Sequence, residues 1–179
     1  MNLRNYLDKM RGNLGGNSSK REIIWSWIGG FLGISAVAWM SAWIFGGNDL
    51  TLVISSMGSS AVLVYGNVDS PLAQPRNLIG GHILSAIVGV ACYKLFLDIP
   101  WLAAASAVAT SIAAMHMTRT LHPPGGSTAL FAVVGSRSIH DMGWNYVLLP
   151  ATVGPLILLA VALLTNNISD TRSYPKRWF

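Results

Sequence analysis

The residues best suited to chemistry lie in the stretch TLHPPGGSTALFAVVG, which runs from Thr120 to Gly135. Two prolines and two glycines precede two hydroxyl side chains, inside a chain that is 52% hydrophobic. Because proline suits the first turn of a helix, we predict an extended lead and then a helix from about Gly125 to Val134. A helix N-terminus carries unpaired amide N–H groups and about half a positive charge. Such an end, placed inside the protein and flanked by glycine, is suited to binding an anion.

A second stretch, LTLVISSMGSSAVLVYG from Leu50 to Gly66, has a similar composition. Its first six residues alternate as in a strand, so we predict an extended lead followed by a helix that ends at Tyr65. The segment GSSAVLVYG matches GSTALFAVVG of the other stretch, with one residue added. We therefore expect two opposed half-helices, beginning near Gly58 and Gly125, whose N-termini share one anion site. The residues predicted to bind the anion are Ser56, Gly58, Ser59, Ser60, His122, Gly125, Gly126, Ser127 and Thr128.

Small residues also allow helices to pack closely, which is the alternative role for these glycines. For Gly58, Gly125 and Gly126 the sequence leaves both roles open. Packing is the preferred interpretation for three other glycines, which are Gly80, Gly81 and Gly89.

The elements that must position these residues are membrane helices. Only 11% of the residues are charged, whereas soluble domains carry about 25%. The mean hydropathy is +0.47. Four stretches without Asp, Glu, Lys or Arg approach the roughly 20 residues that a spanning helix needs, and they cover residues 23–48, 77–93, 99–118 and 142–169. We predict an all-α membrane protein with six membrane segments, of which four are full helices and two are broken.

The segments follow the order long, broken, long, and then repeat it. An odd number of segments per repeat predicts two inverted three-segment repeats, over about residues 23–97 and 99–165. The transmembrane domain then covers residues 23–167, between a basic N-terminal segment at 1–22 and a basic tail at 168–179. Basic flanks predict that both ends are cytoplasmic.

Arg76 and Arg119 test the number of crossings. Six crossings place both arginines on the cytoplasmic side, whereas four crossings with two re-entrant loops place them outside, against the Lys/Arg bias. We therefore prefer six. The two guanidinium groups either reach the headgroups or attract anions to the mouth of the site, and Arg119 is the better candidate for attraction. Because the basic residues flank spans and form no soluble face, we expect no nucleic-acid partner.

The histidines are the titratable groups nearest the predicted site. His122 suits three roles, which are capping the break, donating to the anion and carrying a co-transported proton. His82 and His116 lie within or beside spans, where ionisable groups are functional candidates, although a neutral histidine bonded to a carbonyl is the commoner case. No cysteine or carboxylate cluster joins them, so we predict no metal and no cofactor.

Two long motifs resemble the HPP family of integral membrane proteins. They are SPLAQPRNLIGGH, from Ser70 to His82, and TRTLHPPGGSTAL, from Thr118 to Leu130, and the resemblance extends from about Ile23 to Asn167. The His-Pro-Pro of the family name is His122, Pro123 and Pro124. Family members usually continue Ala-Gly-Ala-Thr-Ala, whereas this chain continues Gly-Gly-Ser-Thr-Ala. Plastid and cyanobacterial members are associated with nitrite transport, which the resemblance therefore implies here.

The sequence thus predicts a transporter of a small monovalent anion, with nitrite as the first candidate, in a bacterial inner membrane or its equivalent. The small protomer also suggests a homo-oligomer within the lipid bilayer. One alternative is an intramembrane hydrolase that uses Ser59 or Ser127 with His82 or His122, although neither GxSxG nor HExxH is present. The other is a scaffold without a substrate. We predict no enzymatic activity. The sequence leaves open whether the protein is a channel or a proton-coupled carrier. It also leaves open whether nitrate, formate or bicarbonate compete with nitrite.

Overall fold

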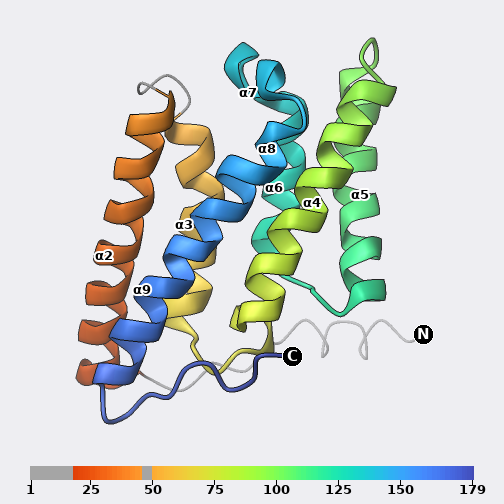
Figure 1. Ribbon diagram of the computed structural model, residues 1–179. Coiled ribbons are helices and arrows are strands. Elements are labelled where there is room, and N and C mark those ends of the chain that lie inside the picture. The colour runs from red at the N-terminus through yellow and green to blue at the C-terminus, as the bar shows by residue number, and fades with distance from the viewer. Residues whose placement is uncertain (1–17, 46–49) are drawn as a thin grey trace, which may run out of the picture.

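The computed structural model describes residues 18–45 and 50–179, which form a bundle of helices (Figure 1). Most of the basic segment predicted at 1–22 lies outside the described residues. Within the described residues there is no strand, so the predicted all-α class is confirmed for them. The elements are α2 (Lys20–Phe45), α3 (Leu50–Gly66), η1 (Pro71–Ala73), α4 (Pro75–Leu95), α5 (Pro100–Thr118), α6 (Pro123–Val134), α7 (Arg137–Met142), α8 (Asn145–Leu148), η2 (Leu149–Val153) and α9 (Gly154–Ile168).

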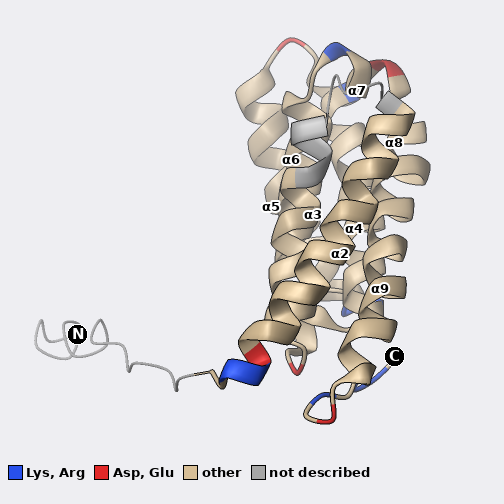
Figure 2. Cartoon of the chain, turned by 90° about the vertical axis from the view of Figure 1, so that its left-hand side faces the viewer, with Lys and Arg blue, Asp and Glu red and all other residues tan. Residues whose placement is uncertain are grey.

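Four helices are long and apolar enough to cross a membrane. They cover Lys20–Ile44, Pro75–Leu95, Pro100–Thr118 and Asn145–Ile168, and they correspond to the four predicted full spans. Large apolar side chains cover their outer surfaces, as the 73% exposure of Trp39 illustrates. Charged residues lie toward the two ends of the bundle (Figure 2). The chain is therefore a multi-pass membrane protein.

The helices pack as two groups of three. Helices α2, α3 and α9 contact one another, and α4 contacts both α5 and α6, which also contact each other. The groups meet where α3 packs on α6 and where α4 packs on α9. Lys20 and the C-terminus lie at the same end of the bundle (Figure 1).

Glycines bring α4 and α6 unusually close together. A Cβ added to Gly81 would lie 2.5 Å from Cβ of His122, and one added to Gly89 would lie 2.6 Å from the Ala129 carbonyl oxygen. At Gly80 the added carbon would lie 2.6 Å from Cγ2 of Thr120. The packing role predicted for these three glycines is confirmed.

The second short segment folds nearly as predicted. Helix α6 begins at Pro123, two residues before the predicted start, and ends at the predicted Val134. Its N-cap residue, His122, has an extended backbone with φ −139° and ψ 106°. Because Pro123 disfavours helical backbone at the preceding residue, the helix can begin only here, part-way along the bundle (Figure 1).

The first short segment is not broken, so the predicted extended lead over LTLVIS is wrong. Leu50 to Gly66 is one helix of 17 residues. Inside a bilayer a helix satisfies its own backbone N–H and C=O groups, which outweighs the strand preference of branched residues. Gly58 consequently lies within the helix and does not start it. Of the two predicted half-helices only α6 is present, so the predicted pair of opposed half-helix N-termini is not formed.

Candidate functional site

A chain of buried polar side chains crosses the region where the two helix groups meet. It consists of Ser56 and Ser60 from α3, His82 from α4, and His122 and Thr128 at the start of α6. None of the five residues is more than 3% exposed. We call these five residues the hydroxyl–imidazole chain.

Five short contacts connect its members in a line. Ser56 Oγ lies 2.7 Å from Thr128 Oγ1, which lies 2.7 Å from His82 Nδ1. His82 Nε2 lies 2.7 Å from Ser60 Oγ, which lies 2.9 Å from His122 Nε2. The line ends where His122 Nδ1 meets the Leu72 carbonyl oxygen at 2.8 Å. Every ring nitrogen of the two histidines therefore has a partner.

Local structure explains how these side chains meet. Ser56 and Ser60 are four residues apart in α3, so they lie on one face of that helix. The absence of a Cβ at Gly81 lets His122 lie against α4, beside His82. The Tyr146 hydroxyl of α8 donates to the Thr128 carbonyl at 2.9 Å and anchors α6 from its other side.

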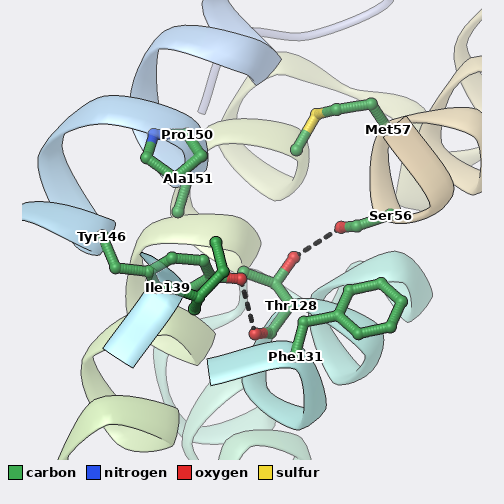
Figure 3. Close-up of a pocket in the computed structure, with 8 residues that line it drawn as sticks. All are labelled: Ser56, Met57, Thr128, Phe131, Ile139, Tyr146, Pro150 and Ala151. Atoms are coloured by element: carbon green, nitrogen blue, oxygen red, sulfur yellow. Dashed lines mark hydrogen bonds between the residues drawn. The ribbon is translucent and has the colours of Figure 1, made fainter. Parts of the chain in front are cut away.

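The head of the chain opens on a small cavity, which Figure 3 shows together with the Ser56–Thr128 contact. Its lining residues are Ser56, Met57, Thr128, Phe131, Ile139, Tyr146, Pro150 and Ala151. The cavity volume is about 10 Å³, at the lower limit of what a single water molecule requires. An anion of three heavy atoms does not fit in this conformation.

The N-terminus of α6 offers few free amide donors. Pro123 and Pro124 carry no N–H, and the N–H of Gly125 donates to the His122 carbonyl at 2.8 Å. The amide-rich anion site that we predicted at this end is therefore not formed by these positions. Side chains supply the polar groups in its place.

The structure brings together only some of the predicted site residues. Ser56, Ser60, His122 and Thr128 belong to the hydroxyl–imidazole chain, whereas Ser59 and Ser127 line an open groove outside it, between α3 and α6. The remaining predicted site residues are three glycines, which lie outside the hydroxyl–imidazole chain. Gly125 packs on Ser85, since a Cβ added to Gly125 would lie 2.7 Å from Ser85 Oγ. A Cβ added to Gly126 would have Val108 Cγ1 as its nearest neighbour, at 4.0 Å, and one added to Gly58 would have no neighbour within 4 Å.

His82 was a candidate that the sequence did not place in the site. Its signal was an ionisable residue inside a span, and the structure makes it the centre of the hydroxyl–imidazole chain. Ser60 and His82 also resemble a nucleophile and base. However, Ser60 has no exposed surface, so a carbonyl substrate cannot reach it in this conformation. Among the described residues, neither Ser59 nor Ser127 has a hydrogen bond to a histidine, and no group of three His, Cys, Asp or Glu could hold a metal.

Three arginines surround a pocket at the end of the bundle that holds both Lys20 and the C-terminus. We call it the arginine pocket; its volume is about 280 Å³, and it is lined by Gln74, Arg76, Asn77, Arg119, Arg177, Trp178 and Phe179. Arg76 Nη2 donates to the Thr118 carbonyl at 2.8 Å, and Asn77 Nδ2 donates to the Leu121 carbonyl at 2.8 Å. None of the three arginines has an ion-pair partner among the described residues. Because Asn77 lines the pocket and contacts Leu121, the pocket borders the residue directly before His122.

Arg119 occupies a backbone conformation that favours glycine. Its φ is 58° and its ψ is 37°, at the residue that closes α5. The N–H of Arg119 donates to His116 and that of Thr120 donates to Met115, which is the Schellman pattern of helix ends. A non-glycine residue here costs about 1–2 kcal/mol, so the position holds a guanidinium group at the expense of stability.

Arg177 was missed because it reaches the pocket only when the tail folds back. The Tyr174 hydroxyl donates to the Ala73 carbonyl at 2.8 Å, and the N–H of Lys176 donates to Gln74 Oε1 at 2.8 Å. Burial raises the pKa of the Tyr174 hydroxyl above its ordinary value, so the donor of this contact is also retained at moderately alkaline pH. A tail contact of this kind has no local sequence signal.

Comparison with known proteins identifies the family. A family model described as "HPP, transmembrane region" matches residues 16–175. The chain belongs to the HPP transmembrane family. Two Dictyostelium discoideum relatives, each named only as a transmembrane protein, are 38% and 40% identical to this HPP chain over 161 residues, or 88% of it. The match covers 51% and 56% of their lengths, so the chain spans about half of these relatives. No solved structure matches the chain.

Proposed function

We propose that this HPP protein transports a small monovalent anion across the membrane, with nitrite as the first candidate. The observation that carries the proposal is the arginine pocket, which three arginines line and which borders Leu121, the residue before His122. Clustered positive charge concentrates anions, and guanidinium groups suit planar oxyanions. Nitrite is planar and singly charged, and the resemblance to nitrite-transporting family members favours it over nitrate, formate and bicarbonate.

Six membrane segments in two inverted repeats remain the proposed architecture. In the matched segments, Ser60 aligns with Thr128, and the two side chains contact the two ring nitrogens of His82. Ser59 aligns with Ser127, and both line the groove between α3 and α6. Each helix group also takes its third helix from the other proposed repeat, since α9 packs on α2 and α4 packs on α6. These three features support two intertwined halves of opposite direction.

Transport requires the bundle to open, because the cavity beside Ser56 has space for about one water. An irregular π-helical turn, Leu149–Val153, borders this cavity through Pro150 and Ala151. Such turns mark positions where a helix can bend. Thr152 Oγ1 donates to the Val147 carbonyl at 2.7 Å and so supports the irregular turn in the closed form. We place the hinge here.

In the proposed orientation both chain ends and the arginine pocket face the cytoplasm. Lipid surrounds the exposed apolar side chains, and the small bundle favours a homo-oligomer. The part of the chain that the structure describes also contains a buried serine and histidine in contact, but the burial of Ser60 disfavours the hydrolase alternative. The scaffold alternative does not explain why Arg119, rather than glycine, occupies a left-handed backbone conformation.

Nitrite uptake by proteoliposomes tests the proposal, with Arg119→Gly as the central variant. Glycine removes the cation and suits the left-handed backbone, so the protein should melt at the same temperature or higher. The KM for nitrite should rise about tenfold, which corresponds to about 1.4 kcal/mol. Arg119→Lys should retain most of the affinity.

The matched control is Arg137→Gln, which removes one exposed cation at the other end of the bundle and should leave KM unchanged. Native protein that takes up no more nitrite than empty liposomes would overturn the nitrite proposal. Uptake by Arg119→Gly with a native KM would overturn the role of the arginine pocket. Nitrate, formate and bicarbonate are then tested as competitors in the same assay.

A further inference from the structure

We propose that the hydroxyl–imidazole chain is an oriented proton wire, which conducts a proton between the cavity beside Ser56 and the loop that carries Leu72. Coupling of that proton to the anion rests on the proposed function, whereas conduction itself does not. The inference stands on the five consecutive contacts of 2.7–2.9 Å through residues that are almost completely buried.

The direction of the wire follows from its last contact. A carbonyl oxygen only accepts, so the Nδ1 of His122 must donate to Leu72. In the neutral ring Nε2 then has no proton and accepts from the hydroxyl of Ser60. Because that hydroxyl has one proton, Ser60 must in turn accept from Nε2–H of His82.

The same reasoning reaches the head of the wire. With its proton on Nε2, the neutral His82 ring accepts at Nδ1 from the Thr128 hydroxyl. Thr128 has then used its proton and accepts from the Ser56 hydroxyl. All five donors therefore point from Ser56 toward Leu72, and no contact in the line has two protons or none.

A proton entering from a water in the cavity can follow this polarity. Ser56 Oγ binds it and releases its own proton to Thr128, which releases one to His82 Nδ1. His82 releases the Nε2 proton to Ser60, and Ser60 releases one to His122 Nε2. When the bundle opens and a water replaces the Leu72 carbonyl at the half-buried η1, His122 releases its Nδ1 proton to that water. Each step forms one O–H or N–H bond and breaks another, and no electron is transferred.

Among the described residues, the two imidazoles are the only titratable side chains that belong to the path. The ring centroids of His82 and His122 are 5.1 Å apart. Helices α3, α5, α6 and α9 contain no Asp, Glu, Lys or Arg, and the charged residues of α4, Arg76 and Lys94, lie at its ends. The other titratable group facing the wire is the Tyr146 hydroxyl of α8, which donates to the Thr128 carbonyl. The His116 side chain on α5 is exposed and outside the wire.

A proton wire fits the transport of a monovalent anion. An unpaired charge is costly to move through a low-dielectric interior, whereas an anion and a proton together carry no net charge. The head of the wire lies at the cavity beside the proposed hinge, and its end lies near the arginine pocket, since Leu121 contacts Asn77. Proton and anion can therefore cross in the same opening event.

Proteoliposomes that contain an internal pH dye test the wire, with proton entry and nitrite uptake measured in parallel. Ser60→Ala removes the hydroxyl that contacts both rings and should lower proton entry at least about tenfold. Stimulation of nitrite uptake by an inward proton gradient should disappear with it. Ser60→Thr, which keeps the hydroxyl, should retain both signals.

Ser111→Ala is the matched control, because Ser111 is equally buried but donates only to the Val108 carbonyl of its own helix. Both signals should persist in it. If Ser60→Ala does not fold, Ser56→Ala removes the head of the wire with less disturbance and should give the same losses. Proton entry that survives in folded Ser60→Ala or Ser56→Ala overturns the wire.

The two proposals can fail separately in this assay. Nitrite uptake by native protein without proton entry would overturn the wire and leave anion transport standing. Proton entry that depends on Ser60, in protein that takes up no nitrite, would support the wire and overturn the proposed substrate.

Discussion

Thr128 is the residue that joins most elements of the candidate site. Its hydroxyl contacts Ser56 of α3 and His82 of α4, and its carbonyl accepts from Tyr146 of α8. The residue is 1% exposed, so no solvent can replace a missing partner. Removal of its hydroxyl therefore affects both stability and function.

Thr128→Val keeps the shape of the side chain but leaves the Ser56 hydroxyl and His82 Nδ1 without their partner. We expect a loss of about 1–3 kcal/mol in the free energy of unfolding, because buried polar groups are costly when unpaired. Nitrite uptake should fall in the same variant. Denaturation of the detergent-solubilised protein and proteoliposome flux measure the two effects, and Thr128→Ser should resemble the native protein in both. A valine variant with native stability and native flux would remove Thr128 from the site.

At the scale of elements, we expect opposite effects from alanine at two glycines, Gly81 of α4 and Gly58 of α3. An alanine Cβ at Gly81 would lie 2.5 Å from Cβ of His122 and 3.0 Å from the Thr120 carbonyl oxygen, so α6 and its lead must move away from α4. Gly81→Ala should cost about 1–3 kcal/mol and lower the melting temperature. At Gly58 an added Cβ meets nothing within 4 Å, so Gly58→Ala should be neutral or stabilise the helix by up to about 1 kcal/mol. Equal melting temperatures for the two variants would show that the contact between α4 and α6 is not close.

The two short segments show how far sequence predicts an element. The match between GSSAVLVYG and GSTALFAVVG puts Ser60 and Thr128 at corresponding positions, and both side chains contact His82. It did not predict the backbone. Pro123 forces a break before α6, whereas Ser, Gly and branched residues in α3 do not prevent a continuous helix when the bilayer requires internal hydrogen bonds.

The candidate site was predictable to the same extent. Ser56, Ser60, His122 and Thr128 could be found from their place in the two segments. His82 required the packing of α4 against both segments, which depends on the close approach at Gly81. Arg177 required the fold of the tail. Contacts between distant segments are the part that a single sequence leaves out.

At the scale of the whole molecule, Arg172 ties the tail to the bundle. Its side chain is 1% exposed, and its guanidinium group donates to the Glu22 carboxylate at 2.9 Å and to the Tyr65 carbonyl at 3.1 Å. It also donates to Asn166 Oδ1 at 3.0 Å and to Ser26 Oγ at 2.8 Å. One side chain thus joins α2, α3 and α9.

Arg172→Gln should destabilise the protein by about 3–5 kcal/mol, because it removes the cation beside the partly buried Glu22 carboxylate and the donor to the buried Asn166 Oδ1. Arg172→Lys should also be destabilised, since an ammonium group cannot reproduce the planar fork of donors. The comparison variant is Arg137→Gln, whose exposed pair with Asp141 at 3.9 Å contributes at most about 1 kcal/mol. Denaturant unfolding measures all three. A small effect at Arg172 would show that the tail is not held as described.

The orientation of the whole bundle is the last property that its charges predict. Of the described Lys and Arg residues, Lys94 and Arg137 lie at one end, and the other end carries Lys20, Arg21, Arg76, Arg119, Arg172, Lys176 and Arg177. That bias predicts that the end with the arginine pocket faces the cytoplasm. In a Cys92→Ser background, Ser138→Cys should react with a membrane-impermeant maleimide applied outside intact cells. Ser173→Cys should react only after the membrane is permeabilised, because both serines are exposed but lie at opposite ends. Reversed labelling would place the arginine pocket outside, and labelling of both from outside would contradict the membrane crossing itself.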